Sequence, residues 1–193
     1  MPRRAVRPCA DRILDAAEAL FAKEGYATVS LRQLIAAAGV STTAFYARFD
    51  GKTAVVAALI DNLFAGLHRE AAATLGHAKN LEDGIERGVE LLCAQLGPRQ
   101  PLVRLVLAES GVHGAAARSR AYALLAGFLA HRLRALAERG RIGVGDPDAL
   151  AWALVGALEI HVVRWAVWNE LTLAELRTQL RAAARAILPK EPS

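Results

Sequence analysis

Cysteine is scarce in this sequence: Cys9 and Cys93 are the two that it has in 193 residues. Two thiols so far apart cannot form a disulfide framework or a cysteine-based zinc site. Long apolar runs are also lacking, because charge interrupts stretches such as residues 54–60 well before the roughly 20 residues that a spanning helix needs. Charged residues and Pro8 follow the basic start, where a signal peptide would be apolar. We therefore expect a cytoplasmic protein without a membrane segment.

Motifs of common enzymes are missing as well. The chain has no G-x-S-x-G, H-E-x-x-H or E-x-x-H pattern, which argues against a serine hydrolase, a zinc protease and a di-iron protein. Residues 50–53 resemble the end of a phosphate-binding loop, but its first glycine would fall at Tyr46 and no strand precedes it. We expect no cofactor, no metal and no enzymatic activity.

What the sequence has is helix-forming composition. Apolar residues make up 54% of the chain and charged residues 22%, with Ala, Leu and Arg prominent. Apolar spacing predicts an all-α fold with helices over residues 10–24, 31–38, from 42, 52–75, 81–96, 101–110, 115–139, 147–168 and 172–188. Glycines at 111–114 and 140–145 are expected to separate helices. Residues 1–52 carry eight Lys and Arg against five Asp and Glu, so an anionic partner should bind there first.

Two short helices joined by a tight turn form a predicted helix-turn-helix. Ser30 and Gln33 have the spacing of a capping box at the start of the first helix, and Gly39 ends it. Ser41 caps the second helix, which carries Phe45 and Phe49 inward. Its polar residues, Thr42 and Thr43 at the start with Tyr46 and Arg48 nearer the end, suit base edges and phosphates in a major groove.

These residues carry a resemblance to the TetR family of bacterial transcriptional regulators. The resemblance covers about residues 10–58: the Phe21-Ala22-x-x-Gly25-Tyr26 end of the first helix, Ser30 with Leu34, the Ala38-Gly39-Val40-Ser41 turn, Phe45-Tyr46-x-x-Phe49 and Lys52. It implies an arm at 1–9, a DNA-binding domain at 10–52 and a helical ligand-binding and dimerisation domain at 53–193.

The resemblance also implies roles for individual residues. Tyr46 and Lys52 would hold the DNA backbone, Ser41, Thr42 and Thr43 would lie at the DNA, and Arg32 would reach a guanine. Arg48 replaces the His or aromatic residue more usual at its place. Capping and packing are the alternative roles for the threonines and Tyr46. The basic residues Arg3, Arg4 and Arg7 form either a solvated tail or an arm that follows the adjacent DNA groove.

The last two helices point to a homodimer. Residues 147–168 are apolar nearly all round, so both faces need cover that one chain of this size does not easily supply. Residues 172–188 combine a leucine face with Arg177, Arg181 and Arg185 at four-residue steps, which predicts a solvated face. The resemblance implies that these two helices pair across a two-fold axis, so that the dimer reads a pseudo-palindromic operator.

An unknown small-molecule effector is the third expected partner, beside DNA and a second copy. Polar residues in the apolar helices are candidates to bind it, because a buried polar group needs a partner: Glu109, His113, His131, Glu159, His161 and Trp165. A repressor released by this ligand, with the helix from Lys52 as lever, is the main interpretation. Two alternatives stay open: a helical enzyme using Glu109 and His113 as acid and base, and a regulator without a small ligand.

Overall fold

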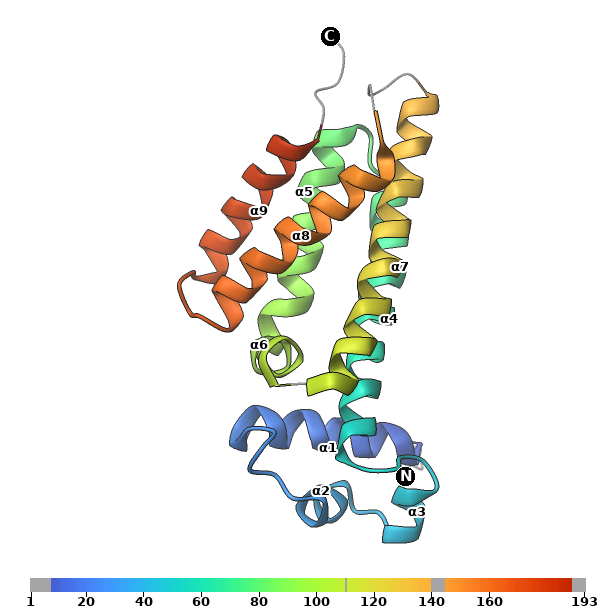
Figure 1. Cartoon of the computed structure of the whole chain (residues 1–193), viewed down its shortest axis with the longest axis vertical. Helices are drawn as coiled ribbons and strands as arrows, with labels where there is room; N and C mark the ends of the chain where they lie inside the picture. The colour runs from blue at the N-terminus through green and yellow to red at the C-terminus, as the bar shows by residue number, and fades with distance from the viewer. Residues whose placement is uncertain (1–7, 110, 140–144, 189–193) are drawn as a thin grey trace, which may run out of the picture. The chain divides into compact units, whose positions relative to one another are not determined.

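The computed structural model describes residues 8–109, 111–139 and 145–188, and these are helical without strands (Figure 1). The helices are α1 (Cys9–Glu24), α2 (Leu31–Ala38), α3 (Thr42–Tyr46), α4 (Lys52–Gly76), α5 (Leu81–Leu96), α6 (Gln100–Arg104), α7 (Gly111–Glu138), α8 (Pro147–Ala166) and α9 (Leu173–Ile187). A 3-10 turn, η1 (Gly97–Arg99), precedes α6, and a π-helical turn, η2 (Leu105–Glu109), follows it. The predicted all-α fold is confirmed.

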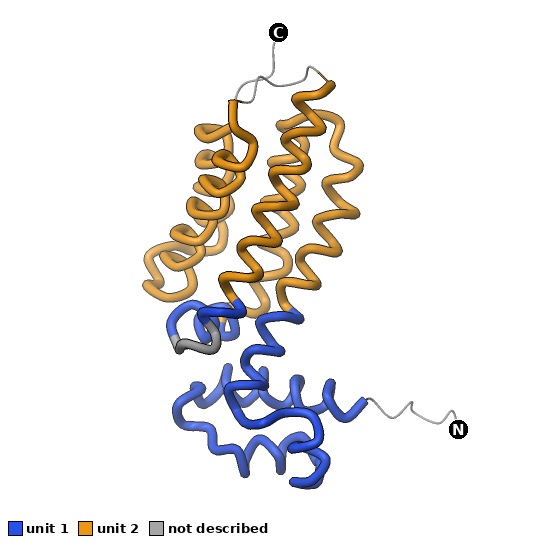
Figure 2. The backbone as a smooth tube through the Cα atoms, turned by 45° about the vertical axis from the view of Figure 1, so that its right-hand side comes forward, with its two compact units in different colours: residues 1–62, 101–117 blue, residues 63–100, 118–193 orange. Residues whose placement is uncertain are grey.

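Two compact units divide the chain (Figure 2). The first combines residues 1–62 with residues 101–117, and the second combines residues 63–100 with residues 118–193. The unit that holds the helix-turn-helix therefore also includes residues 53–62 and 101–117, which the resemblance implied for the second domain. Helix α4 begins in the first unit and continues into the second.

The first unit is built on an apolar core drawn from α1, α2, α3 and α4. Ile13, Leu34, Phe45 and Ile60 are fully buried there. Helix α1 ends at Gly25, whose φ of 80° suits glycine. Tyr26 then packs back on α1, with its ring 5.3 Å from that of Phe21 and at 73° to it.

In the second unit α4 and α7 run side by side in the same direction (Figure 1). The ring of Phe64 meets that of Tyr122, and further along His68 meets Phe128. Beyond these contacts Arg132 donates a hydrogen bond of 2.6 Å to the carbonyl of Leu75 near the end of α4. Helices α7 and α8 meet through small residues, with Ala126, Ala130, Ala151 and Val155 buried at their contact.

Three predicted helix boundaries are wrong. Helix α7 begins at Gly111, so the glycines at 111–114 do not separate helices; glycine costs about 1 kcal/mol relative to alanine, and the alanine-rich run that follows offsets it. The helix expected over 101–110 is divided into α6 and η2. Helix α3 ends at Tyr46, so Arg48 and the half-buried Phe49 lie after it.

The predicted solvated arginine face of α9 is also wrong, because it packs on the glutamates of α5. Arg177 pairs with Glu90 at 3.1 Å, and Arg181 bridges Glu86 and Glu90 at 2.6 and 2.5 Å. Arg185 donates to Glu82 and Glu86. The four-residue step of the arginines matches the four-residue step of the glutamates, so two helix faces of opposite charge align.

Helix α8 keeps a large apolar surface outside the core. Among the described residues it has the length and apolar composition, with a mean hydropathy of 1.3, that would also allow a helix to cross a membrane, although helices of soluble proteins pass the same test. Val155, Val162 and Trp165 are buried, while Trp152 and Ile160 are 51% and 44% exposed. One face of α8 therefore packs within the chain and the other is uncovered.

Candidate nucleic-acid interface

Serine side chains cap the starts of both α2 and α3, and a glycine ends α2 at the turn between them. The hydroxyl of Ser30 accepts from the Gln33 amide at 3.2 Å, while the side chain of Gln33 accepts from the Ser30 amide at 2.8 Å. Gly39 ends α2 with φ 61° and ψ 38°, a left-handed conformation that glycine adopts without strain. Ser41 then accepts from the Ala44 amide at 3.1 Å and starts α3. The predicted capping box and second cap are confirmed.

Arg12 of α1 closes the end of α2, a role that the sequence analysis missed. Its guanidinium donates to the carbonyl of Ala38 at 2.8 Å and to that of Gly39. A charged donor at a helix C-terminus stabilises carbonyls that have no partner within the helix. The sequence signal was weak, since an Arg in a polar position of α1 is ordinarily read as solvated.

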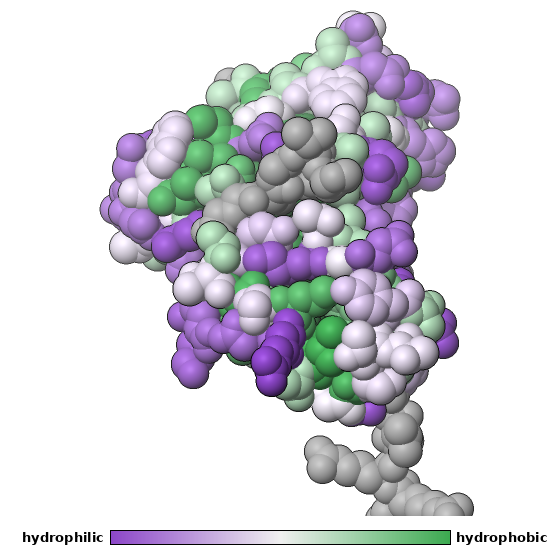
Figure 3. Space-filling model, turned by 60° about the horizontal axis from the view of Figure 1, so that its bottom comes forward, coloured by the Kyte–Doolittle hydropathy of each residue, from purple (hydrophilic) through white to green (hydrophobic). Residues whose placement is uncertain are grey.

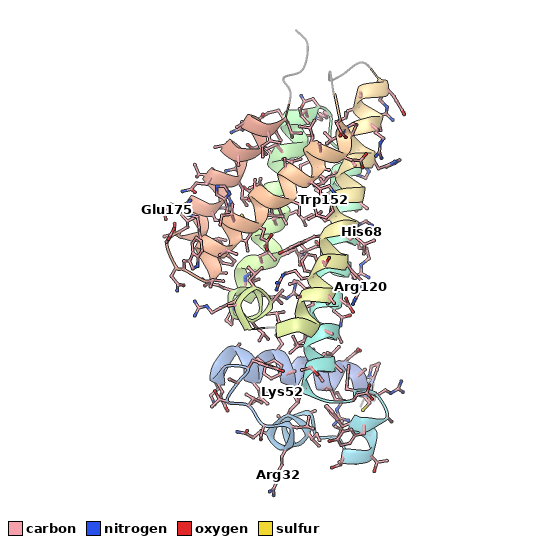
Figure 4. All side chains as sticks on the ribbon, in the orientation of Figure 1. Arg32, Lys52, His68, Arg120, Trp152 and Glu175 are labelled. Atoms are coloured by element: carbon pink, nitrogen blue, oxygen red, sulfur yellow. The ribbon has the colours of Figure 1, made fainter. Side chains whose placement is uncertain are left out.

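The short helix α3 buries one aromatic residue and exposes its hydroxyl-bearing side chains. Phe45 is fully buried, whereas the adjacent Tyr46 is 52% exposed. Ser41, Thr42, Thr43 and Arg48 are exposed as well. On α2, Arg32 is exposed and points away from the helix (Figure 4). Figure 3, which turns the bottom of the Figure 1 view forward, shows hydrophilic side chains beside apolar ones on that face.

Lys52, the first residue of α4, has its ammonium group in contact with the protein. Its Nζ donates to the carbonyls of Tyr26 and Val29 at 2.6 and 2.8 Å, and lies 4.1 Å from the centre of the Tyr26 ring. Burial raises the pKa of Tyr26, which keeps its phenol neutral beside the ammonium. The predicted backbone contact of Lys52 stays a prediction, and these carbonyl contacts bear on it below. Arg3, Arg4 and Arg7 lie outside the described residues.

A capped helix pair with exposed hydroxyls and cations can do two things at a DNA duplex. Hydroxyl and guanidinium groups donate to phosphate oxygens and to base edges in the major groove.

Residues 13–59 match the family model described as bacterial regulatory proteins, tetR family. Over these residues the chain is similar to the TetR family. The match supports a transcriptional regulator of TetR type that binds DNA through this part of the chain.

Solved structures have the same fold over nearly the whole chain. A protein from Syntrophomonas wolfei assigned to the TetR family of transcriptional regulators is 17% identical, with a TM-score of 0.82 over 93% of this chain and 94% of that one. SmeT, the repressor of the Stenotrophomonas maltophilia multidrug efflux pump SmeDEF, is 20% identical, with a TM-score of 0.76 over 94% and 89% of the chains.

A third similar structure contains a ligand. FadR from Bacillus subtilis, in complex with stearoyl-CoA, is 15% identical, with a TM-score of 0.78 over 92% and 97% of the chains. No match to a curated protein was found. At these identities the likeness to solved structures shows the fold.

The residues predicted to bind an effector do not form one cluster among the described residues. His131 is exposed, so the expectation that it is a buried polar group is wrong: it lies on the outer side of α7. Trp165 is buried, and its carbonyl accepts a hydrogen bond of 3.3 Å from Gln100. The side chains of Glu109 and His113 lie outside the described residues.

The two remaining candidates on α8, Glu159 and His161, have partners in the protein. A ring nitrogen of the half-buried His161 lies 2.6 Å from the carbonyl of Ala157, one turn earlier. Burial raises the pKa of Tyr122, and a hydrogen bond to the carboxylate of Glu159 raises it further. Their partial burial therefore does not by itself require a bound molecule. Within the described residues, no group of three His, Cys, Asp or Glu side chains is placed to hold a metal ion.

Proposed function

We propose that this protein is a cytoplasmic, ligand-responsive repressor that binds a pseudo-palindromic operator as a homodimer. The observation that carries the proposal is the exposure of Tyr46, Thr42 and Thr43 on a helix fixed by a serine cap, directly beside the fully buried Phe45. Helix α3 can therefore insert its polar face into a major groove while its core contact stays intact.

Roles follow from position and chemistry within this proposal. Thr42 and Thr43 contact base edges, and Ser41 lies at the same helix start. Tyr46 and Arg48 donate to phosphates, and Arg32 on α2 reaches a guanine, which a guanidinium recognises through two parallel bonds. The residues up to 52 form the reading head, and the chain from 53 onward supplies the dimer contact and the effector site.

The uncovered face of α8 supports the homodimer. Trp152 and Ile160 lie about two turns apart on one side of the helix, and a Cβ added to Gly156 between them would have nothing within 4 Å. Pairing with the same face of a second copy would bury these side chains and set the spacing of the two reading heads at about 34–36 Å or a multiple of it. Helix α9 adjoins α8 and would complete a four-helix bundle.

Release by an effector requires a link between the helices from 81 to 168 and the reading head. Helix α4 provides it, because its start lies in the first unit and its remainder in the second. A small, mainly apolar molecule that favours a different tilt of α4 needs about 1–3 kcal/mol of coupling to weaken DNA binding 5- to 150-fold. The acyl ligand of the similar FadR structure makes stearoyl-CoA a reasonable first compound.

Fluorescence titration against DNA from upstream of its own gene tests this function. The wild type should bind saturably in the nanomolar range with a steep negative salt dependence. Tyr46→Ala should weaken binding about tenfold or more by losing a phosphate contact, while Lys23→Ala, an exposed cation at the end of α1, should not. The proposal would be contradicted if the wild type, Tyr46→Ala and Lys23→Ala all bound upstream DNA weakly and no better than random DNA. A compound that raises the melting temperature but leaves DNA affinity unchanged would contradict the release mechanism.

A further inference from the structure

Lys52 has a set of contacts that its expected role as a phosphate clamp does not require. Its ammonium donates two charge-assisted hydrogen bonds, at 2.6 Å to the carbonyl of Tyr26 and at 2.8 Å to that of Val29. Such bonds are about twice as strong as those between neutral groups. The Tyr26 ring, 4.1 Å from Nζ, adds a cation–π contact on one side of the same group.

The two carbonyls belong to the segment that joins α1 to α2. Val29 is 1% exposed and directly precedes Ser30, the N-cap that starts α2. Tyr26 in turn packs edge-on against the buried Phe21 of α1. One ammonium group thus connects the first residue of α4 to the end of α1 and to the start of α2.

Two of the three donors of a lysine ammonium are engaged by these carbonyls. A phosphate contact of the expected kind would have to break these bonds or rely on the third donor alone. We propose that Lys52 is a positioning residue, which ties α4 to the Tyr26–Val29 segment and so makes the start of α2 follow any movement of α4. The part of this inference that concerns DNA rests on the proposed function.

The hydrogen bonds of Lys52 attach α4 to the segment between α1 and α2 at a defined point. Arg12 holds the other end of α2 to α1 through the carbonyls of Ala38 and Gly39. With a cation bonded to backbone at each end of α2, the helix pair moves as one body with α4 and α1. A displacement of α4 is therefore transmitted to the exposed surface of α3 through these hydrogen bonds, and not only through contacts with flexible loops.

The experiment compares Lys52→Met, Lys52→Gln and Lys23→Met with the wild type. Met keeps most of the length of the side chain and removes the charge, Gln is also neutral but keeps an amide NH2 donor, and Lys23→Met removes an exposed charge from the same domain. Amide hydrogen exchange is measured on the DNA-free protein. We expect the amides of residues 26–31 to exchange about tenfold faster in Lys52→Met, less so in Lys52→Gln, and unchanged in Lys23→Met.

DNA titration across salt concentrations separates positioning from clamping. Lys52→Met should lower operator affinity while the slope of log K against log salt stays that of the wild type. A phosphate contact would instead reduce the slope by about 0.9, and that result with unchanged exchange at 26–31 would overturn the proposal. Faster exchange throughout the domain with unchanged affinity would overturn it too, in favour of a purely stabilising role. If the wild type fails to bind operator DNA, the proposed function is wrong. The exchange data still test whether Lys52 holds the segment from Tyr26 to Val29.

Discussion

Gly39 meets two constraints at a single residue of the helix-turn-helix. Its φ of 61° is left-handed, and a Cβ built on it would lie 2.9 Å from a guanidinium nitrogen of Arg12. Any other side chain would therefore strain the backbone and also push Arg12 away from the carbonyls that it holds. The turn and the contact between α1 and α2 depend on the same small residue.

We expect Gly39→Ala to lower the free energy of unfolding by about 1–2 kcal/mol, because a left-handed alanine is strained and the Arg12 contact is disturbed. Urea unfolding measures the loss. Gly66→Ala is the matched control: Gly66 lies in helix α4 with nothing within 4 Å of an added Cβ, so the same change should stabilise by about 0.5–1 kcal/mol. Equal effects at both glycines would contradict this account.

Two elements far apart in sequence, α5 and α9, are joined by a ladder of opposite charges. Glu82, Glu86 and Glu90 face Arg185, Arg181 and Arg177 in that order. The hydrogen bond from Arg185 holds the pKa of Glu82 below its usual value, although burial opposes the shift, and the same contact raises the pKa of Arg185. The ladder therefore favours the charged form of both partners.

The sign of this shift predicts an acid dependence of the α5–α9 contact. Because folding lowers the pKa of Glu82, its contribution to stability is present above the ordinary value of 4.5 and is lost as the pH falls through the folded pKa. We expect the wild type to lose more stability between pH 6 and about pH 3 than Arg185→Met, as measured by urea unfolding at each pH. Molar salt should reduce the difference, since the pairs are partly exposed. Identical pH profiles would show that the pair contributes nothing.

At the scale of the whole molecule, the uncovered face of α8 predicts an assembly. Large apolar side chains that remain half exposed in one chain are expected to be buried by a partner. Trp152 is 51% exposed and Ile160 is 44% exposed, and both belong to the helix that the proposed dimer places at its centre.

We expect sedimentation to give a dimer for the wild type at micromolar concentration and a monomer for Trp152→Glu with Ile160→Glu, because buried carboxylates oppose the contact. Operator affinity should fall with the loss of the second reading head. Leu124→Glu is the control, since Leu124 is 67% exposed on α7, outside the proposed interface. A monomeric wild type, or equal dissociation of the control, would rule out this arrangement.

Local sequence determined most of the helices and the helix-turn-helix. Hydrophobic spacing and the Ser30, Gly39 and Ser41 signals predicted α1, α2 and the start of α3, because caps and left-handed glycines act within a few residues. The same reasoning placed Phe45 in the core and Tyr46 outside it. Boundaries near Gly111 and Tyr46 were wrong, since glycine is only a weak breaker of helices and α3 ends without a local stop signal.

Only the tertiary structure decided which partners the charged side chains take. The four-residue spacing predicted a solvated face for the arginines of α9, the resemblance implied that Lys52 holds the DNA backbone, and nothing in the sequence singled out Arg12. In the fold they contact glutamates of α5, the carbonyls of Tyr26 and Val29, and the end of α2. A long cationic side chain forms bonds with whatever acceptor the packing brings within reach, and packing between distant segments leaves no local pattern in the sequence.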